Sequence, residues 1–243
     1  EDTALVSLMW ANNETGVLFP IEEAVAIARA KGVLFHTDAV QAVGKTPIDL
    51  AKVPVDFLSF SGHKIHAPKG IGVLFVRKGR KLPPLLFGHQ ERGRRGSTEN
   101  VPGIVGLGVA AELAAAALEG AELRIAALRD HLESELLARI PGAFVNGAGA
   151  ERVPNTTSLC LGSVEAEPIL DKLDRAGICA SAGAACTASG TEPSHVLTAM
   201  GLPPEASLAT IRFSLSRYTT AEEIGRVIEI LPGIVRMFAA EAA

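Results

Sequence analysis

The stretch DFLSFSGHK (residues 56–64) joins a run of apolar residues to a lysine. The apolar run, residues 55–60, predicts a buried strand, and Lys64 lies just beyond its carboxyl end. Open α/β sheets bind their ligands outside the carboxyl ends of parallel strands. A lysine at this place is costly to bury unless it is neutralised, paired or used covalently. Lys64 is therefore the first candidate functional residue.

A second predicted strand ends in an acid. Residues 33–37 predict another buried strand, Asp38 follows at its end, and Gln41 comes three residues later. An acid and a lysine on neighbouring strand ends suit pyridoxal 5′-phosphate (PLP). The lysine forms a Schiff base with this cofactor, and the acid keeps its pyridine nitrogen protonated. The pair alone leaves two other interpretations open, a buried Asp38–Lys64 salt bridge or two unrelated loop residues.

The first half of the chain alternates strand and helix signals. A helix is predicted from Pro20, a residue favoured in the first helical turn, and Gly32 can end it. Four strands are predicted, at residues 4–10, 33–37, 55–60 and 72–76. Near-continuous apolar strands that alternate with helices predict an α/β fold with a mostly parallel sheet covered on both faces.

The second half has a different pattern. Two long helices are predicted at residues 101–118 and 123–140. The elements after them are shorter and typical of a small α+β domain: strands at 156–161 and 210–215, and helices at 165–176 and 221–231. We therefore expect a large domain over residues 1–118 and a smaller domain over residues 119–243. The chain opens directly on a strand-like segment without an initiator Met, so further residues are expected upstream.

The composition narrows the class of protein. The chain has 243 residues, of which 48% are hydrophobic and 21% charged, with a formal net charge of −4. This is typical of soluble globular proteins; the basic cluster at residues 92–95 is too short to indicate nucleic-acid binding. No apolar run is expected to approach the roughly 20 residues of a membrane span. The three cysteines, Cys160, Cys179 and Cys186, lack metal-like spacing, and their odd number favours a reducing, cytoplasmic setting.

Six motifs follow one another in a fixed order along the chain. They are WANNETG (10–16), HTDAVQ (36–41), SGHK (61–64), GRRGSTEN (93–100), AACT (184–187) and RFSL (212–215). In this order they closely resemble the cysteine desulfurases of the nitrogen-fixation (NifS) type, within the class V aminotransferase family. The resemblance covers nearly the whole chain and implies the type I fold of PLP-dependent transferases.

The resemblance also assigns roles in the large domain. It implies that Lys64 binds the cofactor covalently and that Asp38 faces the pyridinium nitrogen. The other residues implied in cofactor binding are Asn13 and Gln41 on the phenolic oxygen side, and Ser61, Gly62, His63 and Thr98 around the phosphate. Family members donate the residue at Thr98 across a dimer interface, so a homodimer is expected. Read locally, Asn13 and Gln41 also suit turn and capping chemistry, and Thr98 suits a helix entry.

The remaining two motifs carry a cysteine and an arginine. Cys186 lies among small residues with no apolar period, whereas Cys160 and Cys179 lie in strand-like contexts and read as small buried hydrophobes. The resemblance makes Cys186 the catalytic nucleophile. Arg212 lies in an apolar strand, which argues against a solvated surface charge, and its planar fork suits a carboxylate. The family uses the matching arginine to bind the substrate carboxylate.

The implied reaction removes sulfur from L-cysteine and releases L-alanine. Cys186 would keep the sulfur as a persulfide and deliver it to an iron–sulfur scaffold protein, with nitrogenase maturation as the expected use. A transient iron–sulfur ligand role for Cys186, shared with the scaffold, is a further expectation. The rival interpretations are a related PLP enzyme, such as an aminotransferase or selenocysteine lyase, and a non-catalytic sulfur carrier. The chain departs from the family pattern at four positions: Phe87, Ser97, Ala182 and Ala184.

Overall fold

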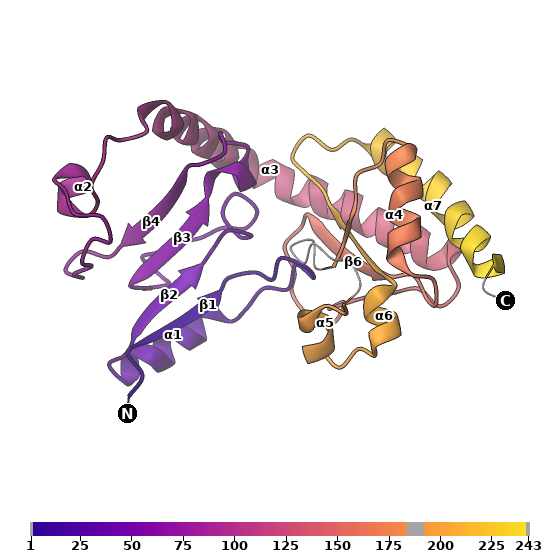
Figure 1. The fold of residues 1–243 in the computed structure, drawn as a ribbon, viewed down its shortest axis with the longest axis horizontal. Coiled ribbons are helices and arrows are strands. Elements are labelled where there is room, and N and C mark those ends of the chain that lie inside the picture. The colour runs from indigo at the N-terminus through magenta and orange to yellow at the C-terminus, as the bar shows by residue number, and fades with distance from the viewer. Residues whose placement is uncertain (1, 184–191, 242–243) are drawn as a thin grey trace. The chain divides into compact units, whose positions relative to one another are not determined.

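The structure is a computed structural model that describes residues 2–183 and 192–241. It divides into two compact units (Figure 1). Unit 1 comprises Glu1–Ala11 and Phe19–Leu118, and unit 2 comprises Asn12–Leu18 and Glu119–Ala243. The short segment Asn12–Leu18 therefore leaves unit 1 and packs with a part of the chain that follows more than a hundred residues later.

Unit 1 is built on a four-stranded sheet in the order β1-β2-β3-β4. The strands are β1 (Leu5–Met9), β2 (Leu34–Asp38), β3 (Phe57–Ser61) and β4 (Gly72–Val76). The first three are parallel, and β4 is antiparallel to β3. The connection between β3 and β4 is too short for a crossover, so β4 returns alongside β3 in the opposite direction. The prediction of an α/β fold with a mostly parallel sheet is confirmed.

Helix α1 (Ile21–Ala30) connects β1 to β2. Pro20 precedes it, and Glu22 and Glu23 lie in its first turn, where negative charge stabilises the helix dipole. Its buried side chains, Val25 among them, form the apolar face that packs beside β2 (Figure 1). Gly32 follows the helix with a φ of 70°, a conformation that favours glycine.

The sheet of unit 1 is more exposed than the sequence predicts. Leu5, Leu8 and Met9 of β1 are 46%, 39% and 37% exposed, and Leu74 of β4 is 49% exposed. The prediction of a sheet covered on both faces is therefore wrong for this structure. Among the described residues, the packing on this sheet comes from α1 and the first part of α3, which leaves these apolar side chains accessible.

A single helix, α3 (Val101–Arg139), replaces the two helices that the sequence predicts. Residues 119–122 include no proline, and Gly120 alone is not enough to stop a helix. In unit 1, Leu107 and Ala114 of α3 pack with Ile65 in a small apolar cluster.

The first part of α3 also corrects a sequence expectation. Val101–Leu118 is 18 residues long with a mean hydropathy of 1.8, and 22% of it is buried. By length and composition alone, it is the one helix among the described residues that could cross a membrane. The expectation that no apolar run approaches such a length is therefore wrong for this segment.

Unit 2 contains an antiparallel sheet in the order β5-β6-β8-β7. Its strands are β5 (Phe144–Val145), β6 (Thr156–Cys160), β7 (Ser181–Ala182) and β8 (Thr210–Ser214). Five helices are formed by the described residues of this part of the chain. They are the second part of α3, α4 (Ala166–Arg175), α5 (His195–Ala199), α6 (Pro204–Leu208) and α7 (Ala221–Glu241). Helix α7 extends beyond the predicted residue 231 and includes Pro232.

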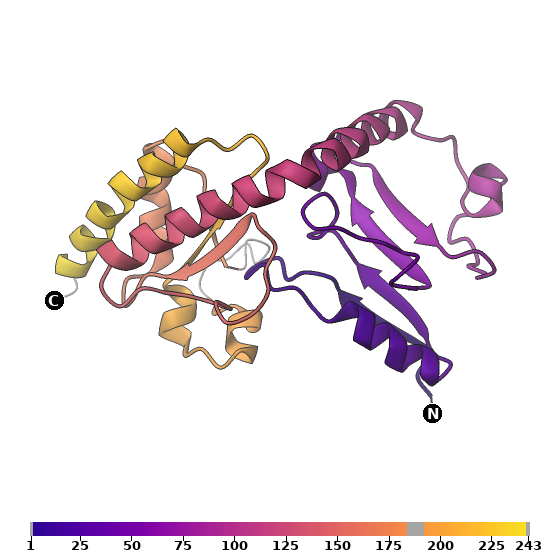
Figure 2. The same ribbon diagram turned by 180° about the vertical axis from the view of Figure 1, so that it is seen from behind.

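The core of unit 2 lies between its sheet and three of these helices. Side chains of α3, α4 and α7 meet those of β6 and β8 in one apolar cluster, and Figure 2 shows α3 and α7 side by side in this unit. Its fully buried members include Leu132, Leu159, Ile169, Ile211 and Leu231. Burial of a large aliphatic side chain contributes roughly 1.5–3 kcal/mol, so this cluster gives β8 and its Arg212 a rigid base.

Candidate active site

The lysine motif forms a tight turn after β3. Lys64 lies in a short 3₁₀ helix, Gly62–Ile65, and its side chain is exposed. Ser61 Oγ and His63 Nδ1 are 2.7 Å apart at hydrogen-bond distance. A Cβ on Gly62 would lie 3.1 Å from the Ile71 carbonyl oxygen, so this turn has little room for a larger residue. The buried side chain of Ile65 fixes the turn, whereas the neighbouring Lys64 is not held by burial.

Asp38 ends β2 beside the lysine strand. The sheet register pairs Asp38 with Met9 of β1 and with Ser59 of β3. Asp38 is exposed, and its Oδ1 accepts a hydrogen bond of 2.9 Å from the Val40 amide. The ion pairs found among the described residues do not join Asp38 to Lys64, so the alternative of a buried salt bridge is wrong here. Gln41 Oε1 accepts a hydrogen bond of 2.6 Å from Lys45 Nζ.

A polar chain crosses the sheet on the face that carries Asp38. His36 Nδ1 lies 2.7 Å from Ser7 Oγ, and His36 Nε2 lies 3.0 Å from Ser59 Oγ. Because strand side chains alternate between faces, His36 and Asp38 share one face of β2. Sequence reasoning missed this chain, although polar residues at alternate positions in otherwise apolar strands were the available signal.

Thr98 lies in an exposed loop of the same unit. Gly96 and Gly88 approach so closely that a Cβ on Gly88 would lie 2.4 Å from the Gly96 Cα. Ser97, which stands where the family commonly has glycine, has a φ of 78°. This left-handed conformation costs a non-glycine residue roughly 1 kcal/mol. The loop is thus held by close backbone packing at Gly96, next to a strained serine.

The donor set of unit 1 fits PLP. Lys64 offers a primary amine for the cofactor's carbonyl group, and Asp38 offers a carboxylate at the neighbouring strand end. Ser61 and His63 supply a hydroxyl and an imidazole, which suit a phosphate dianion. Both Lys64 and Asp38 are exposed and thus accessible to a ligand.

In unit 2, the turn of the first motif holds Arg212. Asn12 Oδ1 accepts hydrogen bonds from the amides of Glu14 and Thr15 at 2.9 and 3.0 Å, which fixes the turn. Arg212 Nη1 donates to the backbone carbonyl oxygen of Asn13 at 2.8 Å. The structure therefore brings Asn13 and Arg212 together, although they are 199 residues apart in sequence. This contact was not predicted.

A buried carboxylate lies in the same turn. Glu14 is 2% exposed, and its Oε2 accepts a hydrogen bond of 2.6 Å from Ser194 Oγ. Ser194 also accepts hydrogen bonds from the amides of Val196 and Leu197 as the N-cap of α5. Sequence reasoning gave Glu14 no role, since a contact over 180 residues leaves no local pattern.

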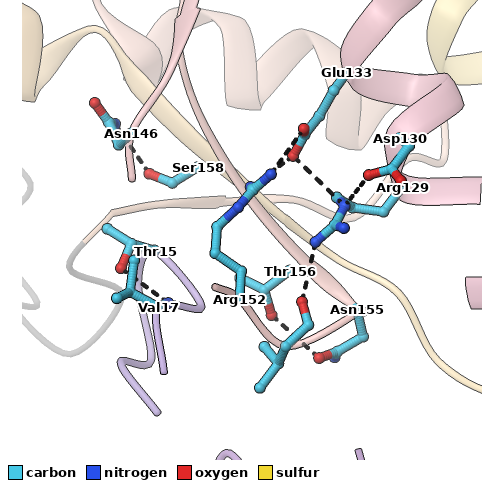
Figure 3. Close-up of polar contacts among 11 residues, drawn as sticks. Thr15, Val17, Arg129, Asp130, Glu133, Asn146, Arg152, Asn155, Thr156 and Ser158 are labelled. Carbon is cyan, nitrogen blue, oxygen red and sulfur yellow. Dashed lines mark hydrogen bonds and ion pairs between the residues drawn. The ribbon is translucent and has the colours of Figure 1, made fainter. Parts of the chain in front are cut away.

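A network of ion pairs supports this turn from the side of α3 (Figure 3). Arg152 contacts Glu133 through both terminal nitrogens, at 2.7 and 3.0 Å. Arg129 lies between Asp130 and Glu133 and donates to the Val153 carbonyl oxygen at 3.1 Å. Residues 151–153 in turn bond the first motif, because the Val153 amide donates to Gly16 O at 2.8 Å. The network therefore anchors the chain segment that pairs with the turn.

The cysteines differ in their surroundings. Cys160 is buried in β6, and burial raises the pKa of its thiol. Cys179 is exposed, so the expectation that it is a buried apolar residue is wrong. It lies just before β7, between helix α4 and the edge of the sheet. Cys186, the proposed nucleophile, and Ala184 lie outside the described residues.

Comparison with known proteins gives a consistent picture. The sequence profile of the aminotransferase class-V family matches residues 1–227. The chain is 56% identical to "Cysteine desulfurase NifS" of Azotobacter vinelandii over 236 residues. It is 57% identical to "Cysteine desulfurase" of Trichormus azollae over 235 residues. These alignments cover 97% and 96% of the chain but 59% of each relative, so the chain spans about three fifths of their length.

Solved structures agree with the sequence relatives. A protein titled "NIFS-LIKE PROTEIN" superposes with a TM-score of 0.88 at 38% identity, covering 98% of this chain and 62% of the other. A NifS-like protein from Rickettsia africae gives a TM-score of 0.87 at 34% identity, covering 96% of this chain and 62% of the other. The resemblance to NifS-type cysteine desulfurases is thereby confirmed. The chain belongs to the class-V aminotransferase family, a membership that implies pyridoxal 5′-phosphate as its cofactor.

Proposed function

We propose that the protein is a cysteine desulfurase that converts L-cysteine to L-alanine and retains the sulfur as a persulfide. The observation that carries this proposal is the identity of 56–57% to relatives named cysteine desulfurase, over at least 96% of the chain. The described residues support it, because they include groups that such a reaction uses. These are an amine, a carboxylate, hydrogen-bond donors for a phosphate, and an arginine.

The residues of unit 1 would hold the cofactor, which acts as an electron sink when bound. Ser61, Gly62 and His63 would bind its phosphate, and Asp38 would hold a proton at its pyridine nitrogen. Gln41 would contact its phenolic oxygen, once its side chain leaves or shares the hydrogen bond with Lys45. The exposed Lys64 would bind the cofactor's carbonyl carbon and then move a proton between the substrate carbons.

The residues of unit 2 would bind the substrate and accept its sulfur. Arg212 would bind the carboxylate of L-cysteine, with its guanidinium oriented by the Asn13 carbonyl oxygen. The Cys186 thiolate would attack the substrate sulfur. A new S–S bond forms, the substrate C–S bond breaks, and its electron pair stays with the substrate carbon, which takes up a proton to give alanine.

The proposal also names a protein that would accept the sulfur. An iron–sulfur scaffold protein would take the sulfur from Cys186, where a shared cluster contact can form. The name NifS of the Azotobacter vinelandii relative supports nitrogenase maturation as the use. A homodimer, with Thr98 given to the phosphate site of the second copy, completes the proposal.

Mass spectrometry tests the central claim. The encoded protein, including any residues that precede Glu1, is loaded with PLP and exposed briefly to L-cysteine. We expect alanine in solution and one added sulfur on Cys186. Cys179 is the matched control, because its thiol is also free and exposed but has no role in the proposed reaction. Sulfur on Cys179 alone, or transfer of the amino group in place of alanine release, would show that the proposed reaction is wrong.

A further inference from the structure

The two described chain ends that flank the Cys186 segment meet at one buried carboxylate. Gly183 precedes the segment, Ser194 follows it closely, and both lie against Glu14. We propose that Glu14 is a positioning residue, which fixes both ends of this segment and thereby the reach of Cys186. The inference rests on the proposed function, because it takes Cys186 as the sulfur acceptor.

On the carboxyl side, the contact is a hydrogen bond. Ser194 Oγ donates to Glu14 Oε2 at 2.6 Å and accepts from two amides at the start of α5. The Ser194 amide donates to Ser207 Oγ at 2.8 Å, which ties the same point to α6. Ser194 is 5% exposed, so loss of the Glu14 acceptor leaves a buried hydroxyl without that partner.

On the amino side, the contact is close packing. A Cβ on Gly183 would lie 3.0 Å from Glu14 Oε2 and 3.9 Å from Ser194 Cβ. Gly183 therefore lies close to both residues, and a side chain there would press against the Glu14 carboxylate. One carboxylate thus contacts the last described residue before the segment and the helix cap after it.

Glu14 is itself held firmly. Asn12 fixes its amide, and Gly16 on the same turn would place a Cβ 3.0 Å from Thr156 Cβ of β6. The neighbouring Asn13 carbonyl oxygen receives Arg212 Nη1. The turn can thus set the substrate arginine and the nucleophile segment relative to the same core strands, β6 and β8. No catalytic group on Glu14 is required for this role.

The test compares Glu14→Ala with Glu14→Gln in the encoded protein. Glutamine keeps an oxygen that can accept the Ser194 hydroxyl, whereas alanine does not. Glu14→Ala should lower kcat for alanine formation about tenfold, the fold-change that corresponds to one lost hydrogen bond to a charged group. KM for L-cysteine and the affinity for PLP should change less than threefold, and Glu14→Gln should restore most of kcat.

A second readout needs no turnover. Iodoacetamide alkylation of Cys186, followed by mass spectrometry without cofactor, reports the accessibility of the thiol. Its rate should change at least threefold in Glu14→Ala, while the rate at the exposed Cys179 stays constant as an internal control. Asp56→Asn alters a carboxylate that is also buried (3% exposed) but bonds Phe35 and Arg80, so it should change neither readout.

The outcomes separate the two claims. Full alanine formation by Cys186→Ala would overturn the proposed function itself. An inactive Cys186→Ala together with unchanged kcat and alkylation in Glu14→Ala would overturn the inference alone. A Glu14→Gln variant as impaired as Glu14→Ala would also overturn it. If Glu14→Ala does not fold, Ser194→Ala against Ser194→Thr decides the same question from the other side of the hydrogen bond.

Discussion

Removal of Arg152 should strongly destabilise unit 2. Its side chain is 9% exposed and makes two hydrogen bonds to Glu133, which is 12% exposed (Figure 3). Breaking a buried ion pair by removing one partner costs about 3–5 kcal/mol. Arg129 remains 3.8 Å from Glu133, so we expect the lower value for Arg152→Met, about 3 kcal/mol. In the double variant Arg152→Met/Glu133→Leu most of this loss should be recovered, because no buried charge stays unpaired.

Urea unfolding followed by circular dichroism measures this effect. With a slope of about 2 kcal/mol per molar urea, a loss of about 3 kcal/mol lowers the midpoint by about 1.5 M. The matched control is Arg175→Met, since Arg175 also pairs with a carboxylate, Asp171, but is 71% exposed. Exposed pairs contribute about 0–1 kcal/mol. Equal midpoints for Arg152→Met and Arg175→Met would refute the reasoning that the buried network anchors this unit.

Three further predictions concern single positions. Arg212→Ala should raise KM for L-cysteine about 10- to 150-fold, through loss of a charge-assisted contact, while the absorbance of bound cofactor is retained; an unchanged KM would place carboxylate binding elsewhere. Ser97→Gly should not reduce the free energy of unfolding, because glycine accepts a φ of 78°, whereas Ser97→Val should cost about 1–3 kcal/mol; equal stability of both would argue against strain there. Burial raises the pKa of the Cys160 thiol in the folded protein. The stability that the protonated thiol contributes is therefore present below its pKa in the unfolded chain and is lost as pH rises through its pKa in the folded protein. Above about pH 8.5 the urea midpoint should fall less in Cys160→Ala than in the wild type, and parallel pH curves would contradict this.

The strands of unit 1 were predictable because their signal is local. Continuous apolar runs identify β1, β2 and β3, and β4 has the predicted bounds, residues 72–76. The same runs carry no information on strand direction. The antiparallel direction of β4 is explained by the short connection between β3 and β4, not by the apolar pattern. Nor could they report coverage, since a run such as β1 reads as buried while its leucines are exposed. Apolar periodicity predicts what a strand can bury, not what is there to cover it.

In the candidate site, too, local features were predictable and long-range contacts were not. Lys64 and Asp38 were found because each lies at or shortly after the end of an apolar run, and parallel pairing then places β2 beside β3. The contacts Arg212–Asn13 and Ser194–Glu14 join residues 199 and 180 positions apart, which no pattern within a sequence window can reveal. The Ser194–Glu14 contact could be inferred only from the fact that a buried glutamate needs a partner, and the burial of Glu14 was itself not predictable.

The motif at residues 12–16 shows how a resemblance and a structure answer different questions. The resemblance gives Asn13 to the cofactor and is silent on its neighbours. In the structure, Asn12, Glu14, Thr15 and Gly16 are all buried, and the turn around them is closed by hydrogen bonds within unit 2. Asn13 is the residue of the motif that is half-buried, and its carbonyl oxygen accepts a hydrogen bond from Arg212. The four buried residues therefore build the turn, and we expect substitutions at them to impair function through geometry rather than chemistry.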